Sequence, residues 1–415
     1  MTPKHPSLHL TAPSLQRIEG EISLPTSKSE SNRLLIMNAL SADPAPIYGL
    51  STANDTQLLE RLLSSREHIL DAHDAGTTFR FLTAYCAITN RPAQLTGTPR
   101  MQQRPIGILV DALRALGAEI DYLGKEGFPP LHIRGFAKQH TDRLQVRGDI
   151  SSQFLSALLM VAPRLPQGLT LEIIPPLRSK PYLEMTLRLM HHFGIRHTRE
   201  QDTITIAPQA YHPVPYTVEA DWSAASYWYA FGTIFPDVQL LLRGLRRESL
   251  QGDQHIVRLM EQLGIKTRFE AAGAKLSPNR AIATDFIADF ADCPDLAQTV
   301  AVICAARGVK ATLTGVSSLK IKETDRLAAL QQELQKIGVL VRFPDADTLC
   351  LDARTPQTPE LPMDTYKDHR MAMCLAPLVA LGELTIRDPE VVRKSYPHFW
   401  DDCERIGIQL TTTDL

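Results

Sequence analysis

The sequence has no continuous apolar stretch long enough to cross a membrane, which excludes a membrane-spanning protein. No apolar run reaches the roughly 18 residues that a transmembrane helix needs, and the N-terminal stretch MTPKHPSLHLTAPSL lacks the apolar centre of a signal peptide. The formal net charge is only -2, so the basic excess typical of nucleic-acid and membrane-surface proteins is also missing. We therefore expect a soluble, cytoplasmic protein with no nucleic-acid or membrane partner, in which any anion-binding site is local.

Cysteine is scarce and widely scattered. The chain has neither a CxxC pair nor a zinc-type His/Cys spacing among its six cysteines, which are Cys86, Cys293, Cys304, Cys350, Cys374 and Cys403. Buried, reduced thiols are therefore expected. A catalytic cysteine is the weaker alternative, since its nearest candidate, Cys374, lies in an apolar helical pattern where burial would silence it.

Motifs for metal binding and nucleotide hydrolysis are missing as well. There is no HExxH motif, and the neighbouring His191 and His192 have no accompanying carboxylates. A glycine-rich P-loop does not occur either. We therefore expect no metal site and no nucleotide hydrolysis.

An internal repeat is the most informative feature that is present. Six runs join a polar or small-residue start to an apolar helical face, and they begin at residues 27, 75, 150, 222, 294 and 367. The last five starts follow one another at intervals of 72 to 75 residues. Units of about 70 residues are too large for a solenoid module and too small for ordinary domains, so we expect them to pack around shared cores.

A second series of helical runs supports the repeat. Each run ends at a glycine suited to a left-handed C-cap and is followed by β-favouring residues; these glycines are Gly117, Gly194, Gly264, Gly338 and Gly407. Short alternating stretches such as QVRGD, LTLEII and YTVEAD are predicted strands. Each repeat therefore combines two helices with several strands in some circular order.

The length favours two lobes. One core for 415 residues would be unusually large, so two lobes of three repeat units each are the more economical arrangement. We place the division near Glu219 to Asp221 and let the N-terminal strand, roughly residues 14–24, cross back. The predicted lobes are residues 1–25 plus 220–415 and residues 26–219, and the predicted fold class is α/β, built from α+β repeats.

The segment LKIKETDRLAAL, residues 319–330, has an unusual charge pattern. Interpreted as a helix start, it puts Lys322 and Arg326 four residues apart on one face, where like charges cost about 0.2 to 0.5 kcal/mol. A bound anion would turn that repulsion into attraction and would leave Glu323 beside two cations, as a proton-transfer residue. A solvated helix face of mixed charge is the alternative, and the segment by itself does not decide between them.

Starts of the other helical runs carry similar side chains. A helix N-terminus offers free N–H groups and a positive dipole end, so a cleft on which these starts converge would attract anions. Ser27, Ser151 and Ser223 could instead be simple N-caps, and any single basic residue could be a surface charge. Four to six charge-assisted hydrogen bonds of about 1.5 to 3 kcal/mol each would hold a doubly charged small molecule.

Nine stretches, taken together, carry a family resemblance. They are LPTSKSESNR, DAGTTFR, RPIGILVDAL, GDISSQF, SKPY, PDLAQT, KETDRL, YKDHRMAM and the late Lys394. In this order, and over nearly the whole chain, they resemble the motifs of the 3-phosphoshikimate 1-carboxyvinyltransferase family, also called EPSP synthase. Each motif alone is weak, whereas the ordered set is specific.

The resemblance implies a fold and a reaction. The fold would be two lobes, each of three βαβαββ units around buried helices, of the inside-out α/β barrel type, with the active site in the cleft between the lobes. The reaction would transfer the enolpyruvyl group of phosphoenolpyruvate to the 5-hydroxyl of 3-phosphoshikimate and release phosphate. It would need no metal or cofactor, its partners would be these two small molecules, and the enzyme would be a monomer.

The resemblance also implies residue roles. The catalytic group would consist of Lys28, Lys322, Asp295 as acceptor of the hydroxyl proton and Glu323 as proton-transfer residue at the methylene carbon. Phosphoshikimate would be bound by Lys28, Ser29, Arg33, Ser151, Ser152, Gln153, Ser179, Tyr182, Asp295, Ser318 and Lys322. Phosphoenolpyruvate would be bound by Lys28, Gly76, Arg104, Gln153, Arg326, Arg370 and Lys394.

Three positions depart from the pattern. The family often has asparagine at the positions of Asp74 and Ser318, and some members have proline at the position of Phe81.

Two rival functions remain. A sister enzyme acting on UDP-N-acetylglucosamine would need an exposed loop cysteine, for which no matching motif occurs. A catalytically dead anion-binding repeat protein would avoid carboxylates such as Asp295 and Glu323 beside its ligand.

Overall fold

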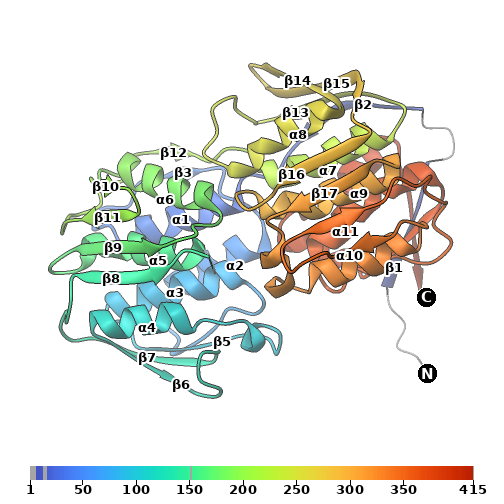
Figure 1. Cartoon of the computed structure of the whole chain (residues 1–415). Coiled ribbons are helices and arrows are strands. Elements are labelled where there is room, and N and C mark those ends of the chain that lie inside the picture. The colour runs from blue at the N-terminus through green and yellow to red at the C-terminus, as the bar shows by residue number, and fades with distance from the viewer. Residues whose placement is uncertain (1–5, 13–15, 150–151, 415) are drawn as a thin grey trace. The chain divides into compact units, whose positions relative to one another are not determined.

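The computed structural model describes residues 6–12, 16–149 and 152–414, and the chain divides into two compact units (Figure 1). Unit 1 comprises Met1–Thr26 and Glu219–Leu415, and unit 2 comprises Ser27–Val218. Each boundary differs from the predicted one by a single residue. No helix among the described residues is both long and apolar enough to cross a membrane.

Unit 2 contains two complete βαβαββ repeats. The first consists of β4 (Ile69–Asp71), α3 (Gly76–Ile88), β5 (Ala93–Thr96), α4 (Gly107–Leu116), β6 (Ala118–Tyr122) and β7 (Leu131–Phe136). The second consists of β8 (Arg143–Arg147), α5 (Ser152–Val161), β9 (Leu169–Ile174), α6 (Lys180–His192), β10 (Thr198–Glu200) and β11 (Thr203–Ile206). Their sheets have the same order, β4-β5-β7-β6 and β8-β9-β11-β10, in which only the first two strands are parallel.

The third repeat of unit 2 is reduced. It consists of α1 (Lys28–Ala39), β3 (Ile47–Tyr48), α2 (Asn54–Ser64) and β12 (Tyr216–Thr217). β3 and β12 form a two-stranded parallel sheet, to which the structure adds no antiparallel pair from the described residues. The helical half of the predicted repeat is thus present, but most of its sheet is not.

Unit 1 repeats the same arrangement three times. The first repeat consists of β2 (Arg17–Ser23), α7 (Trp222–Ile234), β13 (Asp237–Arg243), α8 (Ile256–Gln262), β14 (Leu263–Glu270) and β15 (Gly273–Ile282). The second consists of β16 (Asp285–Asp289), α9 (Ala297–Arg307), β17 (Lys310–Thr314), α10 (Arg326–Gln335), β18 (Val341–Arg342) and β19 (Leu349–Leu351). Their sheet orders are β2-β13-β15-β14 and β16-β17-β19-β18. Both therefore match the sheets of unit 2.

The last repeat of unit 1 is circularly permuted. It contains α11 (His369–Leu375), β20 (Leu384–Arg387), α12 (Phe399–Arg405), β21 (Gln409–Asp414) and β1 (Pro6–Thr11). β1 pairs antiparallel with both β20 and β21, so the N-terminal strand supplies the middle strand of this sheet. A parallel bridge between Met363 and Ile386 adds a first-strand position on the far side of β20.

Seven short 3-10 helices connect these elements within the described ranges. They are η1 (Met101–Gln103), η2 (Ala162–Arg164), η3 (Gly252–His255), η4 (Pro294–Leu296), η5 (Ser317–Ile321), η6 (Ala376–Leu381) and η7 (Pro389–Lys394). Four of them, η3, η4, η5 and η7, bear on the site described below.

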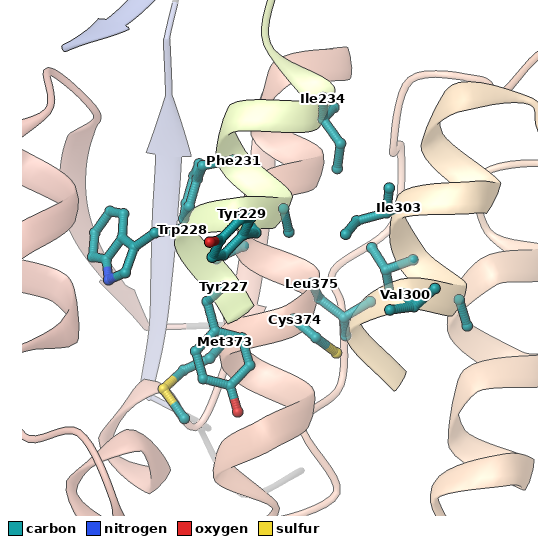
Figure 2. Packing of buried hydrophobic residues seen from close by; sticks show 14 of the residues in the cluster. Tyr227, Trp228, Tyr229, Phe231, Ile234, Val300, Ile303, Met373, Cys374 and Leu375 are labelled. Carbon is teal, nitrogen blue, oxygen red and sulfur yellow. The ribbon is translucent and has the colours of Figure 1, made fainter. Parts of the chain in front are cut away.

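Each core is built from the first helix of every repeat. α1, α3 and α5 pack against one another in unit 2, and α7, α9 and α11 do so in unit 1. In α7 every residue except Ser223 is buried, because a helix that is apolar all round has no face for water. Figure 2 shows Tyr227 of α7 by Met373 of α11, and Leu375 of α11 directed toward Val300 of α9.

These six helices are the six runs that the repeat predicted. The five glycines of the second series also occupy their predicted C-terminal positions, with φ values of 115°, 84°, 101°, 77° and 96° for Gly117, Gly194, Gly264, Gly338 and Gly407. All six cysteines are free, and all except the partly exposed Cys350 are buried. The prediction of the helical repeat is confirmed, and five of the six cysteines are buried as expected.

Predictions for single helix starts had mixed outcomes. Ser27 is the N-cap of α1 and its hydroxyl accepts a hydrogen bond from the Glu30 N–H at 3.4 Å. Ser223 is not a cap, because Asp221 caps α7 and accepts from the Ala224 N–H at 2.8 Å. Ser151 lies outside the described residues.

The interpretation that Lys322 and Arg326 lie on one turn of a helix is wrong. Lys322 follows η5 in an extended conformation, and α10 begins only at Arg326, after its N-cap Asp325. Lys322 and Arg326 therefore do not share a helix face, and the i,i+4 repulsion inferred from their spacing does not apply. The Asp325 carboxylate, which accepts from the N–H groups of Leu327 and Ala328, sets the later start.

The glycine cap of α4 gives a test of the fold. We expect Gly117→Ala to destabilise the protein by about 2 kcal/mol or more, because φ is 115° there and an added Cβ would lie 2.0 Å from the Lys138 carbonyl oxygen. Gly124→Ala is the matched control, since its nearest contact would be an ordinary 3.7 Å. Thermal unfolding of both variants is the measurement, and equal melting temperatures would contradict the cap's importance.

Candidate active site

The buried helices of unit 1 begin at a group of charged side chains. Asp295 lies in η4 just before α9, Asp368 caps α11, and Arg370 is in the first turn of α11. The loop before α10 adds Lys322 and Glu323, α10 itself adds Arg326, and η7 adds Lys394. We call these seven residues the Asp295 cluster.

Arg326 is at the centre of this cluster. Its side chain is 1% exposed and donates to Asp368 Oδ2 at 2.8 Å, to Glu323 Oε2 at 2.9 Å and to Asp295 Oδ1 at 3.2 Å. A buried guanidinium needs this compensation, and its planar fork matches several carboxylates at once. Although burial opposes the charge, Asp368, Glu323 and Asp295 raise the pKa of Arg326 above its usual value.

Asp295 is surrounded by three cations. Its Oδ2 accepts from Arg370 Nη2 at 2.9 Å, and its Oδ1 lies 3.2 Å from Arg326 Nη1 and 3.6 Å from Lys322 Nζ. Burial by itself would raise the pKa of this carboxyl, but the positive charges outweigh burial and hold the pKa well below its usual range. Asp295 is therefore ionised, and its proton affinity depends on how much of that positive charge other anions neutralise.

Lys322 and Lys394 occupy the edges of the cluster. Burial lowers the pKa of the Lys322 ammonium, and Asp295 partly restores it. Lys394 Nζ lies 3.6 Å from Glu323 Oε1, so the Glu323 carboxylate is held between Lys394 and Arg326. The residues that sequence reasoning singled out in KETDRL thus meet Asp295, Arg370 and Lys394 in space.

A second group lies at the helix starts of unit 2. Lys28, the first residue of α1, places its ammonium 3.0 Å from the buried Asp55 carboxylate of α2. Gln153 of α5 donates to the Thr77 hydroxyl of α3 at 3.0 Å. Three helices of different repeats therefore bring their N-terminal residues together here, as they do in unit 1.

Two arginines lie against the start of α3. A Cβ added to Gly76 would be 2.5 Å from Arg80 Nη1 and 2.6 Å from Arg104 Nη1, so both guanidinium groups lie against the Gly76 backbone. Both side chains are buried, and the Arg80 guanidinium also lies over the Phe154 ring at 5.4 Å. We call Gly76, Arg80 and Arg104 the arginine pair site. Two cations at a positive helix end are an arrangement that suits an anion.

Arg33 has a different environment from the one expected of a ligand contact. It is 2% exposed and donates to the hydroxyls of Thr186 and Ser156 and to the carbonyls of Ser29 and Tyr182, at 2.7 to 3.3 Å. Burial lowers its pKa to about 10. Arg33 therefore fastens α1 to α5 and α6, and its contact with a substrate stays a prediction.

The remaining predicted residues lie near helix starts or in turns. Ser152 begins α5 and is buried, Ser179 precedes α6 with a φ of 55°, and Ser318 lies in η5. Tyr182, in the first turn of α6, lies with its ring 6.0 Å from the Arg33 guanidinium carbon. Ser151 is outside the part of the chain that the structure describes.

Sequence reasoning missed three carboxylates that contact the predicted residues: Asp55 beside Lys28, Asp368 beside Arg326, and Asp253 beside Ser223. Asp55 and Asp368 each lie at a helix start, where an acidic residue is usually attributed to the helix dipole. Their ion-pair partners, Lys28 and Arg326, are 27 and 42 residues away along the chain. Local patterns contain no sign of such pairs.

Known proteins resemble this chain over most of its length. Residues 58–403 match the family model described as EPSP synthase (3-phosphoshikimate 1-carboxyvinyltransferase). A 3-phosphoshikimate 1-carboxyvinyltransferase of Bacteroides fragilis (strain YCH46) is 44% identical over 401 residues, which covers 96% of this chain and 97% of that protein. One from Neisseria meningitidis serogroup B is 37% identical over 410 residues, covering 92% and 94%.

Solved structures share the fold. The structure of EPSP synthase from Acinetobacter baumannii is similar with a TM-score of 0.78 at 18% identity, covering 98% of this chain and all of that one. The enolpyruvyl transferase NikO from Streptomyces tendae gives a TM-score of 0.73 at 14% identity, with complete coverage of both chains. The predicted α/β fold of two three-repeat units is confirmed. With the family model and the identities above, these comparisons show that the chain belongs to the EPSP synthase (3-phosphoshikimate 1-carboxyvinyltransferase) family.

Proposed function

We propose that the Asp295 cluster and the helix starts of unit 2 together carry out the reaction of this family. That reaction transfers the enolpyruvyl group of phosphoenolpyruvate to the 5-hydroxyl of 3-phosphoshikimate, and it belongs to the shikimate pathway of aromatic amino acid biosynthesis. The chain is thus an enolpyruvyl transferase. The observation that carries the residue assignment is the contact of Asp295 with three cations, one of which also holds Glu323.

The first chemical step needs a base and an acid. A base must take the proton of the attacking hydroxyl, and an acid must convert the methylene carbon of phosphoenolpyruvate into a methyl group. We assign the base to Asp295 and the acid to Glu323. Elimination of phosphate then requires a base at the same methyl carbon, and Glu323, once deprotonated, returns to that role.

The low proton affinity of Asp295 is a property of the protein without substrate. Phosphoenolpyruvate carries a carboxylate and a phosphate, and we propose that Arg326, Arg370 and Lys394 bind it. Its negative charge would neutralise the cations that now face Asp295, and the pKa of Asp295 would rise. Binding of phosphoenolpyruvate would therefore make Asp295 a stronger base toward the hydroxyl of phosphoshikimate.

The cations of unit 2 have a complementary role in this proposal. Arg104 and Gly76 would hold phosphoenolpyruvate, Lys28 would contact both substrates, and Gln153 would lie against both. Phosphoshikimate would be held by Lys28, Lys322 and the predicted polar group of Ser29, Arg33, Ser151, Ser152, Ser179, Tyr182 and Ser318. Donors already fixed by packing stabilise developing charge without reorganisation, which is the main electrostatic advantage of such a site.

The reaction needs both groups of side chains on the same pair of substrates. We therefore propose that a cleft between the two units brings the two groups of side chains together during turnover and excludes water from the intermediate. We also propose that the enzyme is monomeric and cytoplasmic, as expected from the sequence.

Removing the carboxylate of Glu323 tests the proton-transfer role. We expect Glu323→Ala to lower turnover by a factor on the order of 10² to 10⁴, the usual effect of losing a general acid, while phosphoshikimate affinity changes little. Phosphate release with both substrates measures turnover. Glu390→Ala, an exposed carboxylate of η7, is the control. Turnover of Glu323→Ala within a factor of two of the unchanged protein would refute the assignment.

Arg104 provides a test of the phosphoenolpyruvate assignment. Loss of charge-assisted hydrogen bonds worth about 1.5 to 3 kcal/mol should weaken phosphoenolpyruvate binding in Arg104→Ala roughly 10-fold to 150-fold. Titration calorimetry in the presence of phosphoshikimate is the measurement. Arg100→Ala removes an exposed arginine of the same segment and should bind normally. Unchanged affinity in Arg104→Ala would exclude the contact.

Closure of the two units is the third expectation. Small-angle X-ray scattering should give a smaller radius of gyration when phosphoshikimate and an unreactive phosphoenolpyruvate analogue are both bound. The same protein with phosphoshikimate and inorganic sulfate serves as the control for salt effects. If the scattering curves with and without the substrate pair superimpose, the two groups do not act by closure.

A further inference from the structure

Asp253 is a buried carboxylate behind the Asp295 cluster, and the reaction as assigned above makes no use of it. It lies in η3 and is 2% exposed. Its Oδ2 accepts a hydrogen bond from the Ser223 hydroxyl, whereas its equally buried Oδ1 has no hydrogen-bond partner among the described residues. A buried carboxylate oxygen without a partner costs folding free energy, so packing alone gives no reason for this residue.

Ser223 connects Asp253 to the cluster. The single hydroxyl hydrogen of Ser223 is donated to Asp253, which leaves the lone pairs of its oxygen to accept from Arg370 Nη2 at 3.3 Å. The same Nη2 donates to Asp295 Oδ2 at 2.9 Å. A continuous chain of hydrogen bonds therefore runs from Asp253 through Ser223 and Arg370 to Asp295, and each link has a defined donor and acceptor.

The electrostatic surroundings of Asp253 come from four groups. Asp295 and Arg370 face it from η4 and α11, Asp221 from the N-cap of α7, and the Cys293 thiol from the residue before η4. Burial raises the pKa of Asp253 to about 7; the Asp295 charge adds to this effect and Arg370 opposes it. Burial and the Asp253 charge also raise the pKa of the Cys293 thiol, which therefore stays neutral.

The two protonation states of Asp253 have different consequences. As a carboxylate it accepts from Ser223, and the Ser223 oxygen is free to accept from Arg370. As a neutral carboxylic acid it keeps an oxygen that can accept from Ser223, but without the negative charge this hydrogen bond is roughly half as strong. Protonation of Asp253 therefore weakens the link that holds Arg370 from this side.

We propose that Asp253 is a positioning residue for the enolpyruvyl transfer, which through Ser223 orients Arg370 against Asp295 and does so more strongly as a carboxylate than as a carboxylic acid. This inference rests on the proposed roles of Asp295 and Arg370. It adds a residue outside the predicted binding and catalytic sets, and it gives the reaction a dependence on pH that belongs to the protein rather than to its substrates.

The pH profile of Asp253→Asn is the test. We expect kcat/KM for phosphoenolpyruvate to fall up to about tenfold at pH 8, because the neutral amide oxygen accepts from Ser223 more weakly than the carboxylate does. The ratio of kcat/KM between the unchanged protein and the variant is the decisive quantity, because ionisation of the substrates cancels in it. That ratio should be near one at about pH 5.5 and should rise with a midpoint near pH 7.

Thermal unfolding separates positioning from a purely structural role. Because the pKa of Asp253 is raised in the folded protein, its ionisation destabilises the fold as pH rises from about 4 to about 7, and the full cost is present above pH 7. Asp253→Asn removes that cost. At pH 8 the variant should therefore melt no lower than the unchanged protein although it is slower, whereas a structural residue would lose stability and activity together.

Two further variants complete the design. Ser223→Ala cuts the same chain at another atom, so it should slow the enzyme at least as much at pH 8, and the double variant should be no slower than Ser223→Ala alone. Asp292 is an exposed carboxylate three residues before Asp295 in sequence. Its replacement, Asp292→Asn, should leave the ratio at one. A ratio that does not change with pH, or additive effects of Ser223→Ala and Asp253→Asn, would overturn the proposal.

Failure of this inference can be told apart from failure of the proposed function. If Asp295→Asn retains normal turnover, the assignment of Asp295 as base is wrong, and the positioning role of Asp253 is wrong with it. If Asp295→Asn is inactive and the Asp253→Asn ratio stays flat, only the inference about Asp253 fails. Should Asp253→Asn not fold, Ser223→Ala gives the same decision, because it leaves Asp253 in place.

Discussion

The rest of the site depends on the ion pairs that the buried guanidinium of Arg326 forms. This guanidinium is almost fully removed from water and contacts the carboxylates of Asp295, Glu323 and Asp368, which come from three separate segments of unit 1. A buried cation that lost one of these partners would leave an uncompensated charge, a change that typically costs about 3 to 5 kcal/mol. The starts of α9 and α11 and the loop before α10 are therefore fixed to one another by the charges to which we assign the reaction.

Unit 2 follows the opposite electrostatic plan. Where the carboxylates of the Asp295 cluster compensate its cations, the arginine pair site places Arg80 and Arg104 against the Gly76 backbone at a helix N-terminus. Arg33 and Lys28, at the start of α1, are instead occupied by neutral acceptors and by Asp55. In the proposed function, the Asp295 cluster moves protons between carboxylates and substrate, and the group in unit 2 holds an anion.

Burying charges at these helix ends gives the fold no clear gain in stability. The largely apolar helices α7, α9 and α11 would pack at least as well without charged starts, since replacing buried ion pairs by apolar residues is often neutral or stabilising. Asp253 is the clearest case, because one of its oxygens has no hydrogen-bond partner in the described structure and burial raises its pKa to about 7. The repeat supplies the scaffold, and the starts of α1, α9 and α11 add the charged side chains of Lys28, Asp295, Asp368 and Arg370.

The sequence by itself determined the repeat, the six buried helices, the five glycine caps and the family, because each depends on local spacing or on motifs in order. The tertiary structure decided which charges meet. Lys322 and Arg326 looked like neighbours on a helix, yet the helix begins only at Arg326, and both reach Asp295 instead. Arg33 matched a ligand motif, but packing buried it among hydroxyls and carbonyls. Asp55 and Asp253 gave no signal in the sequence, and the motif that contains Asp368 did not reveal its contact with Arg326, since the partners are distant along the chain and only folding brings them within hydrogen-bonding range.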